Sequence, residues 1–535
     1  MKASVRLAGV MLLTACAAGA QTPAEADWRY RIQTGDTLIA LTDAYLQPGH
    51  SWRELQNLNH VADPLRLPPG GVLRMPLAWL KREASVAEAL FVQGQVTLSR
   101  PQQTEQRLQT GAELRSGDRL RSAAQSSASL RFVDGSRLLI PPLSDVTLEQ
   151  LLVYGRSAIP AVRLRLHEGG ADSQVLPSAG RVPHYEIRTP SVNLGVRGTE
   201  FRAQVDGAAA RLQVLSGTVA ADGQAVPAGM GLLADGQGRP RSAALLAAPD
   251  VGALPALLER LPLRFAWKAS DGASGGWRAQ VFARGDFTRL LLDQRSDAAQ
   301  AAWPDDLPDG DYSLRLRAID ALGLEGRAAE HAFRLKARPE PPFIQGPAPA
   351  ARLYGEAVDL HWTINTQARA YRLQIARDAG FGELVLEQAA LSGNSHRAAL
   401  PPGRYHWRLA ALAADQGPWG DAQQFELIPV PPSPAPAEPE LSGDGLQLRW
   451  RAEAGVARYE LQWAGDAAFS QGLQSLASEQ PAISLPRPGP GRYYLRLRCL
   501  DADGQAGPWG QVQLVNVPYP RWLWLLPLAP LLLAL

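Results

Sequence analysis

The chain has 535 residues, of which 46% are hydrophobic and 20% are charged, and this composition indicates several globular domains rather than one. The 54 Lys and Arg residues against 52 Asp and Glu give a net charge of +2, which excludes the strong basic excess of a dedicated nucleic-acid-binding protein. The two cysteines, Cys16 and Cys499, exclude a disulfide framework and a four-cysteine zinc site. The 43 prolines and 49 glycines favour short strands joined by turns.

Residues 1–20 have the pattern of an export signal. Lys2 and Arg6 precede an apolar run that is too short to remain as a membrane anchor. Two cleavage positions are compatible with it: residues 13–16 (LTAC) resemble a bacterial lipobox that makes Cys16 a lipidation candidate, and residues 18–20 (AGA) form an A-x-A site. Both predict that the mature chain leaves the cytoplasm.

A small β-α-α-β unit follows the signal. Residues 30–33 alternate as a short strand, and Asp36 or Thr37 can then cap a first helix. Ser51 can cap a second helix, with a Glu three residues later to complete a capping box. A Pro-Pro-Gly turn leads into a closing strand at 72–75.

The opening, middle and closing residues of this unit resemble the LysM domain, through Tyr30, Gly35, Asp36, Thr37, Leu38, Asn59, Leu67, Gly70, Leu73 and Pro76. The resemblance implies a domain over residues 28–78 that binds glycans containing N-acetylglucosamine, in bacteria usually peptidoglycan. It implies a groove between two loops, lined by Gly35, Asp36, Thr37, Leu38, Asp63, Pro64, Leu65, Arg66 and Leu67. Free N–H groups at a helix start suit acetamido carbonyls, and apolar side chains suit the N-acetyl methyl group. Individually, Asp36 and Thr37 are better explained as the builders of the turn and the cap.

After a linker over residues 79–90, residues 91–238 predict an all-β roll or sandwich of short hairpins. Apolar and polar residues alternate on both sides of the Asp134-Gly135 turn signal. A Gly-Gly pause at residues 169–170 separates the early hairpins from the later ones. A second linker is expected over residues 239–258.

Four elements in this region, residues 111–120, 132–136, 189–201 and 214–219, resemble the FecR domain of Gram-negative bacteria. The resemblance implies envelope signalling, because the best-known members relay an outer-membrane signal to a cytoplasmic sigma factor. Those members carry a cytoplasmic segment and a membrane span ahead of the β domain. This sequence has an export signal and a LysM-like unit there instead, so we expect an envelope interaction module rather than direct sigma-factor control.

The segment TPSVNLGVRGTEFR (residues 189–202) contains the structural motif Gly195, Arg197, Gly198, Thr199 and Glu200. We expect the two glycines to let the backbone bend or approach a neighbour where a side chain would clash. Arg197 could then tie adjacent carbonyls or Glu200 together with its fixed fork of donors. The alternative is that Arg197 binds an anion or a partner loop.

Three repeats of roughly 90 residues follow, over 259–338, 343–429 and 441–517. Proline-rich segments separate them, including a linker over 430–440 that we expect to be stiff and extended. Each repeat has a Trp on an early strand, an aromatic residue on the next, and a Gly-x-Tyr element before a late strand.

The repeats resemble the fibronectin type III and immunoglobulin-like β-sandwiches, with Tyr312, Tyr405 and Tyr493 as candidate corner tyrosines. We expect the aromatic residues to be core. Trp419 and Trp509, in Gly-Pro-Trp-Gly loops, are expected in exposed turns. The fold class is therefore multidomain and mainly β, with one small β-α-α-β domain.

An apolar tail over residues 518–535 closes the chain. Its apolar run, residues 522–535, is shorter than the about 20 residues of a helical span, and Pro527 and Pro530 interrupt it. We expect it to be a membrane or partner anchor, with a stub that folds back on the last repeat as the alternative.

No catalytic motif, cofactor-binding motif or metal-ligand spacing is recognisable in the sequence. The sequence therefore predicts a non-enzymatic protein of a Gram-negative periplasm or cell envelope, membrane-associated through the tail or a lipid. We expect it to bind peptidoglycan and an envelope or membrane sensor protein, and to bind no nucleic acid or cofactor. The alternative is a cell-wall-modifying enzyme or accessory factor that a LysM domain targets.

Overall fold

The structure, a computed structural model, describes residues 27–157, 159–177, 184–196, 198–236, 239–304, 307–442 and 445–519. Cys16, Arg197 and the apolar tail beyond residue 519 lie outside the described residues, so the expectations for them stay predictions. The chain divides into two compact units, Met1–Ala337 and Arg338–Leu535, and the division falls at the proline-rich segment RPEPP.

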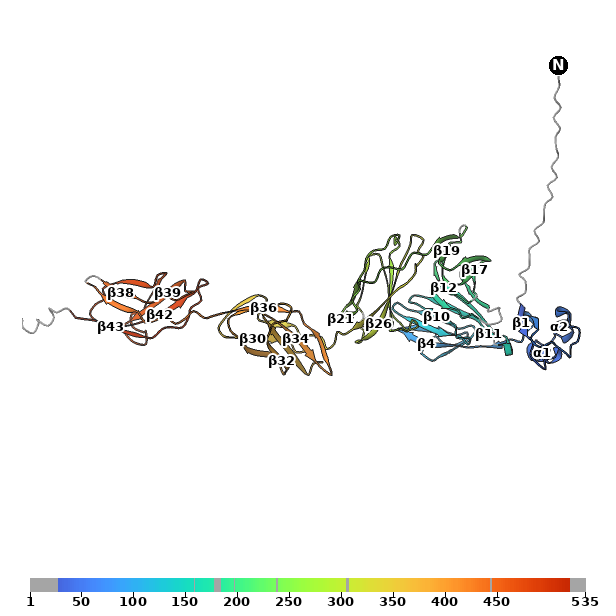
Figure 1. Cartoon of the computed structure of the whole chain (residues 1–535), viewed down its shortest axis with the longest axis horizontal. Helices are drawn as coiled ribbons and strands as arrows, with labels where there is room; N and C mark the ends of the chain where they lie inside the picture. The colour runs from blue at the N-terminus through green and yellow to red at the C-terminus, as the bar shows by residue number, and fades with distance from the viewer. Residues whose placement is uncertain are drawn as a thin grey trace, which may run out of the picture. The chain divides into compact units, whose positions relative to one another are not determined.

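The first unit begins with the β-α-α-β unit (Figure 1). Its elements are β1 (Asp27–Arg31), α1 (Leu38–Tyr45), α2 (Trp52–Asn59) and β2 (Val72–Pro76), with β1 antiparallel to β2. Both predicted caps are confirmed. Thr37 Oγ1 accepts from the Ala40 N–H at 3.1 Å, and Ser51 and Glu54 form a reciprocal capping box at the start of α2.

The core of this small unit is completed by residues from outside it. Leu38, Leu55 and Met75 are fully buried, and the same apolar cluster includes Tyr154 and Ile159 of the next domain. A 3-10 helix, η1 (Leu77–Trp79), leads the chain back against α1 before the next domain begins. The β-α-α-β unit therefore packs on its neighbour instead of standing apart on a linker.

Eighteen strands follow in one closed assembly around a single apolar core. In chain order they are β3 (Glu83–Ala84), β4 (Ala87–Gln93), β5 (Val96–Ser99), β6 (Gln106–Arg107), β7 (Glu113–Leu114), β8 (Arg119–Ser122), β9 (Ser127–Arg131), β10 (Arg137–Ile140), β11 (Asp145–Val153), β12 (Pro160–Gln174), β13 (His184–Arg188), β14 (Asn193–Val196), β15 (Glu200–Asp206), β16 (Ala209–Ser216), β17 (Thr218–Ala221), β18 (Gln224–Pro227), β19 (Met230–Ala234) and β20 (Arg241–Ala244). A short 3-10 helix, η2 (Gly155–Ser157), lies between β11 and β12.

Two expected linkers contain strands of this assembly or of the first repeat. The segment 79–90 includes β3 and the start of β4, and the segment 239–258 includes β20 and β21. These strands are two to seven residues long. Strands of two to four residues show too little alternation to be recognised in the sequence, and their position is set by pairing with neighbours.

The Gly-Gly pause at residues 169–170 lies inside the long strand β12. Residues before it pair with β11, and residues from Gly169 onward pair with β15, so the strand crosses from one sheet to the other at this point. Gly169 has φ +78°, and a Cβ there would lie 2.3 Å from the carbonyl oxygen of Leu143. Glycine is needed because the backbone bends where another segment lies in contact with it.

The first repeat completes the first unit. Its strands are β21 (Leu257–Leu258), β22 (Leu263–Ala266), β23 (Trp277–Ala283), β24 (Leu290–Ser296), β25 (Gln300–Trp303), β26 (Gly310–Ala318) and β27 (Ala329–Leu335). They form a five-stranded sheet, β21-β27-β26-β23-β24, and a two-stranded sheet, β22-β25. Trp267, Trp277 and Trp303 lie in the core between the sheets.

The sheet face of this repeat contacts the preceding β domain through charged side chains. Glu325 is completely buried and accepts from Arg202 of the β domain and from Arg278 and Arg317 of its own repeat. Ser127 Oγ, also in the β domain, donates to the carbonyl oxygen of Leu290 at 2.9 Å. The contact between the two domains therefore contains buried polar groups, beside a small apolar cluster of Leu139, Phe282 and Leu290.

The second unit contains the other two repeats. The second has β28 (Ile344–Gly346), β29 (Ala351–Tyr354), β30 (Ala357–Trp362), β31 (Ala370–Ala376), β32 (Leu384–Leu391), β33 (Ser395–Ala399), β34 (Gly403–Leu412), β35 (Gln416–Trp419) and β36 (Gln423–Ile428). The third has β37 (Glu438–Leu441), β38 (Gly445–Arg449), β39 (Arg458–Ala464), β40 (Gln474–Ser478), β41 (Ala482–Pro486), β42 (Gly491–Leu500) and β43 (Gln513–Val517). Both repeats place a three-stranded sheet against a larger one.

The predicted corner tyrosines are confirmed in all three repeats. The hydroxyl groups of Tyr312, Tyr405 and Tyr493 each donate to the backbone carbonyl oxygen four residues earlier, at 2.7, 2.7 and 3.1 Å. The Trp on the early strand is buried in each repeat, as expected for a core residue. These features are those of a fibronectin type III-like sandwich.

The proline-rich segments before the second and third repeats pack against the repeat that follows. A Cβ on Gly417 would lie 2.0 Å from the carbonyl oxygen of Pro339, and a Cβ on Gly507 would lie 2.3 Å from that of Pro431. Each Gly-Pro-Trp-Gly loop therefore begins with glycine because the proline-rich segment lies directly against it.

The prediction of exposed turns for Trp419 and Trp509 is wrong. Both rings are half-buried and contact arginine side chains, with Arg408 Cζ 4.4 Å from the Trp419 ring centroid and Arg496 Cζ 4.5 Å from that of Trp509. The arginine side chains that cover the two rings lie on a neighbouring strand, so the sequence of the loop alone does not predict the contact.

Candidate functional site

The two loops of the expected glycan groove lie in direct contact. The backbone N–H of Leu38, at the start of α1, donates to the carbonyl oxygen of Pro64 at 2.9 Å. Asp63 Oδ1 accepts from the N–H of Leu65 at 2.9 Å and shapes the second loop as a tight turn. The structure therefore brings the two predicted segments together at one end of α1.

Several predicted groove residues hold the loops in place. Asp36 Oδ2 accepts from the Tyr30 hydroxyl at 2.8 Å and from the Gln33 N–H at 2.6 Å. Burial and this hydrogen bond raise the pKa of Tyr30, so the phenol remains a donor. Leu38 and Leu67 are buried and belong to the core.

The exposed part of the groove is apolar with one free donor. The side chain of Leu65 is 62% exposed and that of Ile39 is 41% exposed. Gly35 and Arg66 are also exposed beside them. Three of the first four N–H groups of α1 donate within the protein, and that of Ile39 has no acceptor among the described residues. An N–H donor beside apolar side chains matches an acetamido group.

Two residues of this unit have roles that sequence reasoning missed. Ile39 lies two positions after the cap residue Thr37, in the first turn, where helix N–H groups lack acceptors within the helix. Its position relative to the cap could therefore have predicted the free N–H group. Asn59, noted only for the resemblance, bonds the backbone of β2 in both directions: Nδ2 donates to the Arg74 carbonyl at 2.8 Å and Oδ1 accepts from the Arg74 N–H at 2.6 Å. It therefore ties the end of α2 to the closing strand.

In the second predicted motif, only part of the expectation agrees with the structure. Gly198 has φ +57°, and a Cβ there would lie 3.1 Å from Pro177, so glycine is required. Gly195 lies in β14 with ordinary backbone angles, and its Cβ would meet Ala220 at 3.8 Å, so the predicted close approach at Gly195 is wrong. Thr199 is buried, and the Glu200 side chain is exposed.

Arg202, directly after this motif, was not singled out from the sequence. Its side chain is 1% exposed, and its Nη2 donates to the carbonyl oxygen of Gly326 at 2.9 Å in addition to its contact with Glu325. Alternation along β15 places Phe201 in the core and Arg202 on the opposite face of the sheet. Its burial depends on the first repeat, which is distant in the sequence.

Comparison with family models agrees with this architecture. The model of the LysM domain matches residues 30–76, and the model described as FecR protein matches residues 118–220. The chain carries a LysM domain and a FecR domain. These domains are typical of bacterial envelope proteins, and the carboxy-terminal repeats are fibronectin type III-like.

Solved structures show similarity of fold over parts of the chain. The chicken CNTN1 FN1-FN3 domains match at 14% identity, covering 48% of this chain and 93% of that chain, with a TM-score of 0.24. A two-domain fibronectin type-III segment of chicken tenascin matches at 12% identity, covering 33% and 100%, with a TM-score of 0.21. A Parabacteroides distasonis protein, named provisionally as an anti-sigma factor, matches at 15% identity, covering 24% and 59%, with a TM-score of 0.20. No curated protein matched the sequence.

Two further observations concern the part of the chain that the structure describes. None of its helices is both long enough and apolar enough to cross a membrane. Within the same residues, no group of three or more His, Cys, Asp and Glu side chains is placed to hold a metal ion.

Proposed function

We propose that this protein is a non-enzymatic component of the periplasm or cell envelope that binds peptidoglycan. The LysM domain holds the glycan, and the FecR domain and the sandwich repeats present surfaces to a protein partner in envelope signalling. A lipid on Cys16 or the tail after residue 518 would tether it to a membrane. The match to both domain models supports the proposal.

The groove at the start of α1 is the observation that carries the glycan-binding proposal. The Ile39 N–H can donate to an acetamido carbonyl, while Ile39 and Leu65 contact the N-acetyl methyl group. Asp36 and Thr37 contribute by fixing the turn and the cap, since their side-chain oxygens already accept hydrogen bonds within the protein. Leu65 is therefore the residue whose change should affect binding without affecting the fold.

The proposal can be tested by co-sedimentation of the mature chain with purified peptidoglycan. Leu65→Asp should weaken binding about tenfold, because it replaces an apolar contact of about 1–2 kcal/mol by a charge. Val133→Asp is the matched control, since Val133 is 60% exposed on the FecR domain and lies outside the groove. Equal binding by both variants, or no binding by the unaltered chain, would show that the groove does not hold the glycan.

A further inference from the structure

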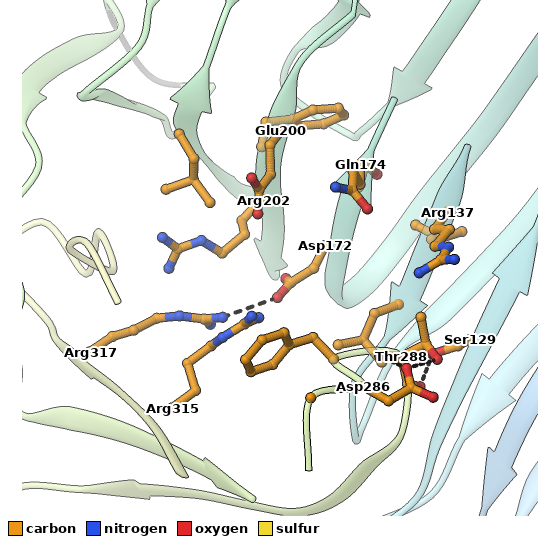
Figure 2. Close-up of a pocket in the computed structure, with 17 residues that line it drawn as sticks. Ser129, Arg137, Asp172, Gln174, Glu200, Arg202, Asp286, Thr288, Arg315 and Arg317 are labelled. Atoms are coloured by element: carbon orange, nitrogen blue, oxygen red, sulfur yellow. Dashed lines mark hydrogen bonds and ion pairs between the residues drawn. The ribbon is translucent and has the colours of Figure 1, made fainter. Parts of the chain in front are cut away.

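A cavity of about 300 Å³ lies where the FecR domain meets the first repeat (Figure 2). The FecR side is formed by β9, β10, β12, β15 and β16, and the repeat contributes β26 and the loop of residues 285–288. The volume is that of a small-molecule site. Apolar side chains, among them Leu215 and Phe287, line it together with polar ones.

Four arginines reach this cavity: Arg137, Arg202, Arg315 and Arg317. Figure 2 shows Arg315 and Arg317 directed toward Asp172, with Arg137 on the other side of the space. The lining also contains three acids, Asp172, Glu200 and Asp286. Donors and acceptors are thus both present, and Glu325 and Glu330, which lie outside the lining, pair with Arg202, Arg317 and Arg315.

Buried polar atoms in this cluster lack a partner within the protein. Arg202 and Arg317 are 1% and 2% exposed, and the Nε atoms of Arg202, Arg315 and Arg317 have no hydrogen-bond acceptor. Asp172 Oδ1 has no donor, although its other oxygen lies 3.5 Å from Arg317. Buried polar groups in folded proteins are nearly always hydrogen-bonded, so these atoms point to a ligand in the cavity.

The arginines at the position of Arg315 in the other two repeats have partners within their own repeats. Arg408 donates twice to Gln374 Oε1, at 2.9 and 2.8 Å, and Arg496 donates twice to Gln462 Oε1, at 3.0 and 2.7 Å. Each of these guanidinium groups also contacts a Phe and a Trp ring. Both arginines are therefore occupied within their own repeats.

Arg315 keeps only one of these contacts, and its Nη2 donates to Glu330 Oε1 at 3.1 Å. Its guanidinium lies 3.9 Å from the Phe287 ring centroid. The Gly326 N–H donates to the Ala318 carbonyl as the Gly507 N–H donates to the Cys499 carbonyl, so Ala328 stands where the third repeat has its Trp. The glutamine at the position of Gln374 is Gln280, whose Nε2 donates to Asp293 but whose Oε1 accepts no hydrogen bond from Arg315. The first repeat has thus lost the two partners that occupy the arginine elsewhere, and its arginine faces the cavity.

The charges of the cluster are consistent with an anionic ligand. Burial and the nearby charge of Arg317 lower the pKa of Arg202 to about 9, although Glu325 and Asp172 oppose this. Burial and Arg317 also lower the pKa of Arg315. A negative group between these side chains would stabilise their charged forms.

We propose that the cavity binds a small monocarboxylate with a neighbouring N–H or O–H donor. The arginines hold the carboxylate through paired guanidinium N–H donors, and Asp172 or Glu200 accepts from the adjacent donor. A phosphate dianion fits less well because three acids share the lining. The monocarboxylate belongs either to the carboxyl end of a peptide or to a free hydroxy acid. This proposal does not depend on glycan binding by the LysM domain.

Isothermal titration calorimetry on the mature chain tests this. N-acetylalanine represents a peptide carboxyl end, and lactate represents a hydroxy acid. The probe that binds with the higher affinity identifies which of the two classes the cavity takes. N-acetylalaninamide, which lacks the carboxylate, should not bind. Binding of inorganic phosphate without either carboxylate, or no binding of any probe, would overturn the proposal.

Three variants locate the binding. Arg315→Met and Arg137→Gln should each weaken carboxylate binding about tenfold or more, because each removes a charge-assisted contact. Arg408→Met is the matched control and should leave affinity unchanged, since Arg408 is the equivalent residue in the second repeat. Arg137 is exposed, and its guanidinium has no partner among the described residues, so Arg137→Gln should fold normally even if Arg315→Met does not. Unchanged affinity in the folded variants would contradict the assignment.

Discussion

Arg202 Nη1 lies 3.3 Å from Glu325 Oε2, and both side chains are almost completely buried although 123 residues separate them in the sequence. Gln204 also donates to Glu325, and Arg278, Arg295 and Arg317 surround the same carboxylate. One acid of the first repeat therefore compensates several arginines at the junction with the FecR domain.

Removing this carboxylate should destabilise the first unit strongly. Glu325→Gln leaves buried guanidinium groups without their counter-charge, which typically costs about 3–5 kcal/mol. The free energy of unfolding can be measured by urea denaturation of the mature chain with tryptophan fluorescence. Glu330→Gln is the control, because Glu330 is an exposed partner of Arg315 and its loss should cost less than about 1 kcal/mol. A difference of under about 1 kcal/mol between the two variants would contradict the buried-charge account.

The same residue should make stability depend on acid pH. Burial raises the pKa of Glu325, but the charges of Arg278, Arg317 and Arg202 outweigh burial and hold the pKa well below its ordinary value of 4.5. The unfolded chain therefore binds the proton first as pH falls. The stability that Glu325 contributes should be complete above pH 4.5 and should decline below it. Unfolding free energies of the unaltered chain and of Glu325→Gln should converge as pH falls through this range. A constant difference across it would argue against a depressed pKa.

The corner tyrosine of the second repeat should contribute a measurable hydrogen bond. Tyr405 is fully buried and its hydroxyl donates to the Pro401 carbonyl at 2.7 Å, so Tyr405→Phe should lower the stability of that repeat by about 1 kcal/mol. Tyr519→Phe is the control, since Tyr519 is 63% exposed. Thermal unfolding followed by circular dichroism would show a lower Tm for the first variant alone. Equal Tm values for the two variants would mean that the Tyr405 hydroxyl does not contribute to the stability of the repeat.

A methyl group at Gly417 should disturb the packing of the proline-rich segment. In Gly417→Ala the new Cβ would lie 2.0 Å from the Pro339 carbonyl oxygen, so the segment must move, at a cost of about 1–3 kcal/mol. Gly465→Ala is the control, because its nearest neighbour would be at 3.6 Å. Limited proteolysis near residue 339 should become faster in the first variant and remain unchanged in the second. Equal cleavage would indicate that the segment does not depend on this contact.

The sequence by itself determined the features that depend on neighbouring residues. The caps at Thr37 and Ser51, the LysM and FecR motifs, and the three repeats with their corner tyrosines were all predictable, because each needs a few residue types at short, fixed spacing. For the candidate glycan groove, the sequence predicted which two loops form it. That Leu38 donates to Pro64 and leaves the Ile39 N–H free could not be read from the sequence.

Tertiary structure alone decided what the charged and polar side chains do. Arg202, Arg315 and Arg408 all lie on strands whose alternation places them away from the core, where an arginine is ordinarily exposed. The first repeat buries Arg202, Arg315 lies at the same junction facing the FecR domain, and the tryptophan of its own repeat covers part of Arg408. Similar strand patterns therefore lead to different surroundings. The bend in β12 at Gly169 and the packing of Pro339 on Gly417 depend on contacts between residues distant in the sequence. Local alternation shows on which face of a strand a residue lies, and only the folded chain determines what covers that face.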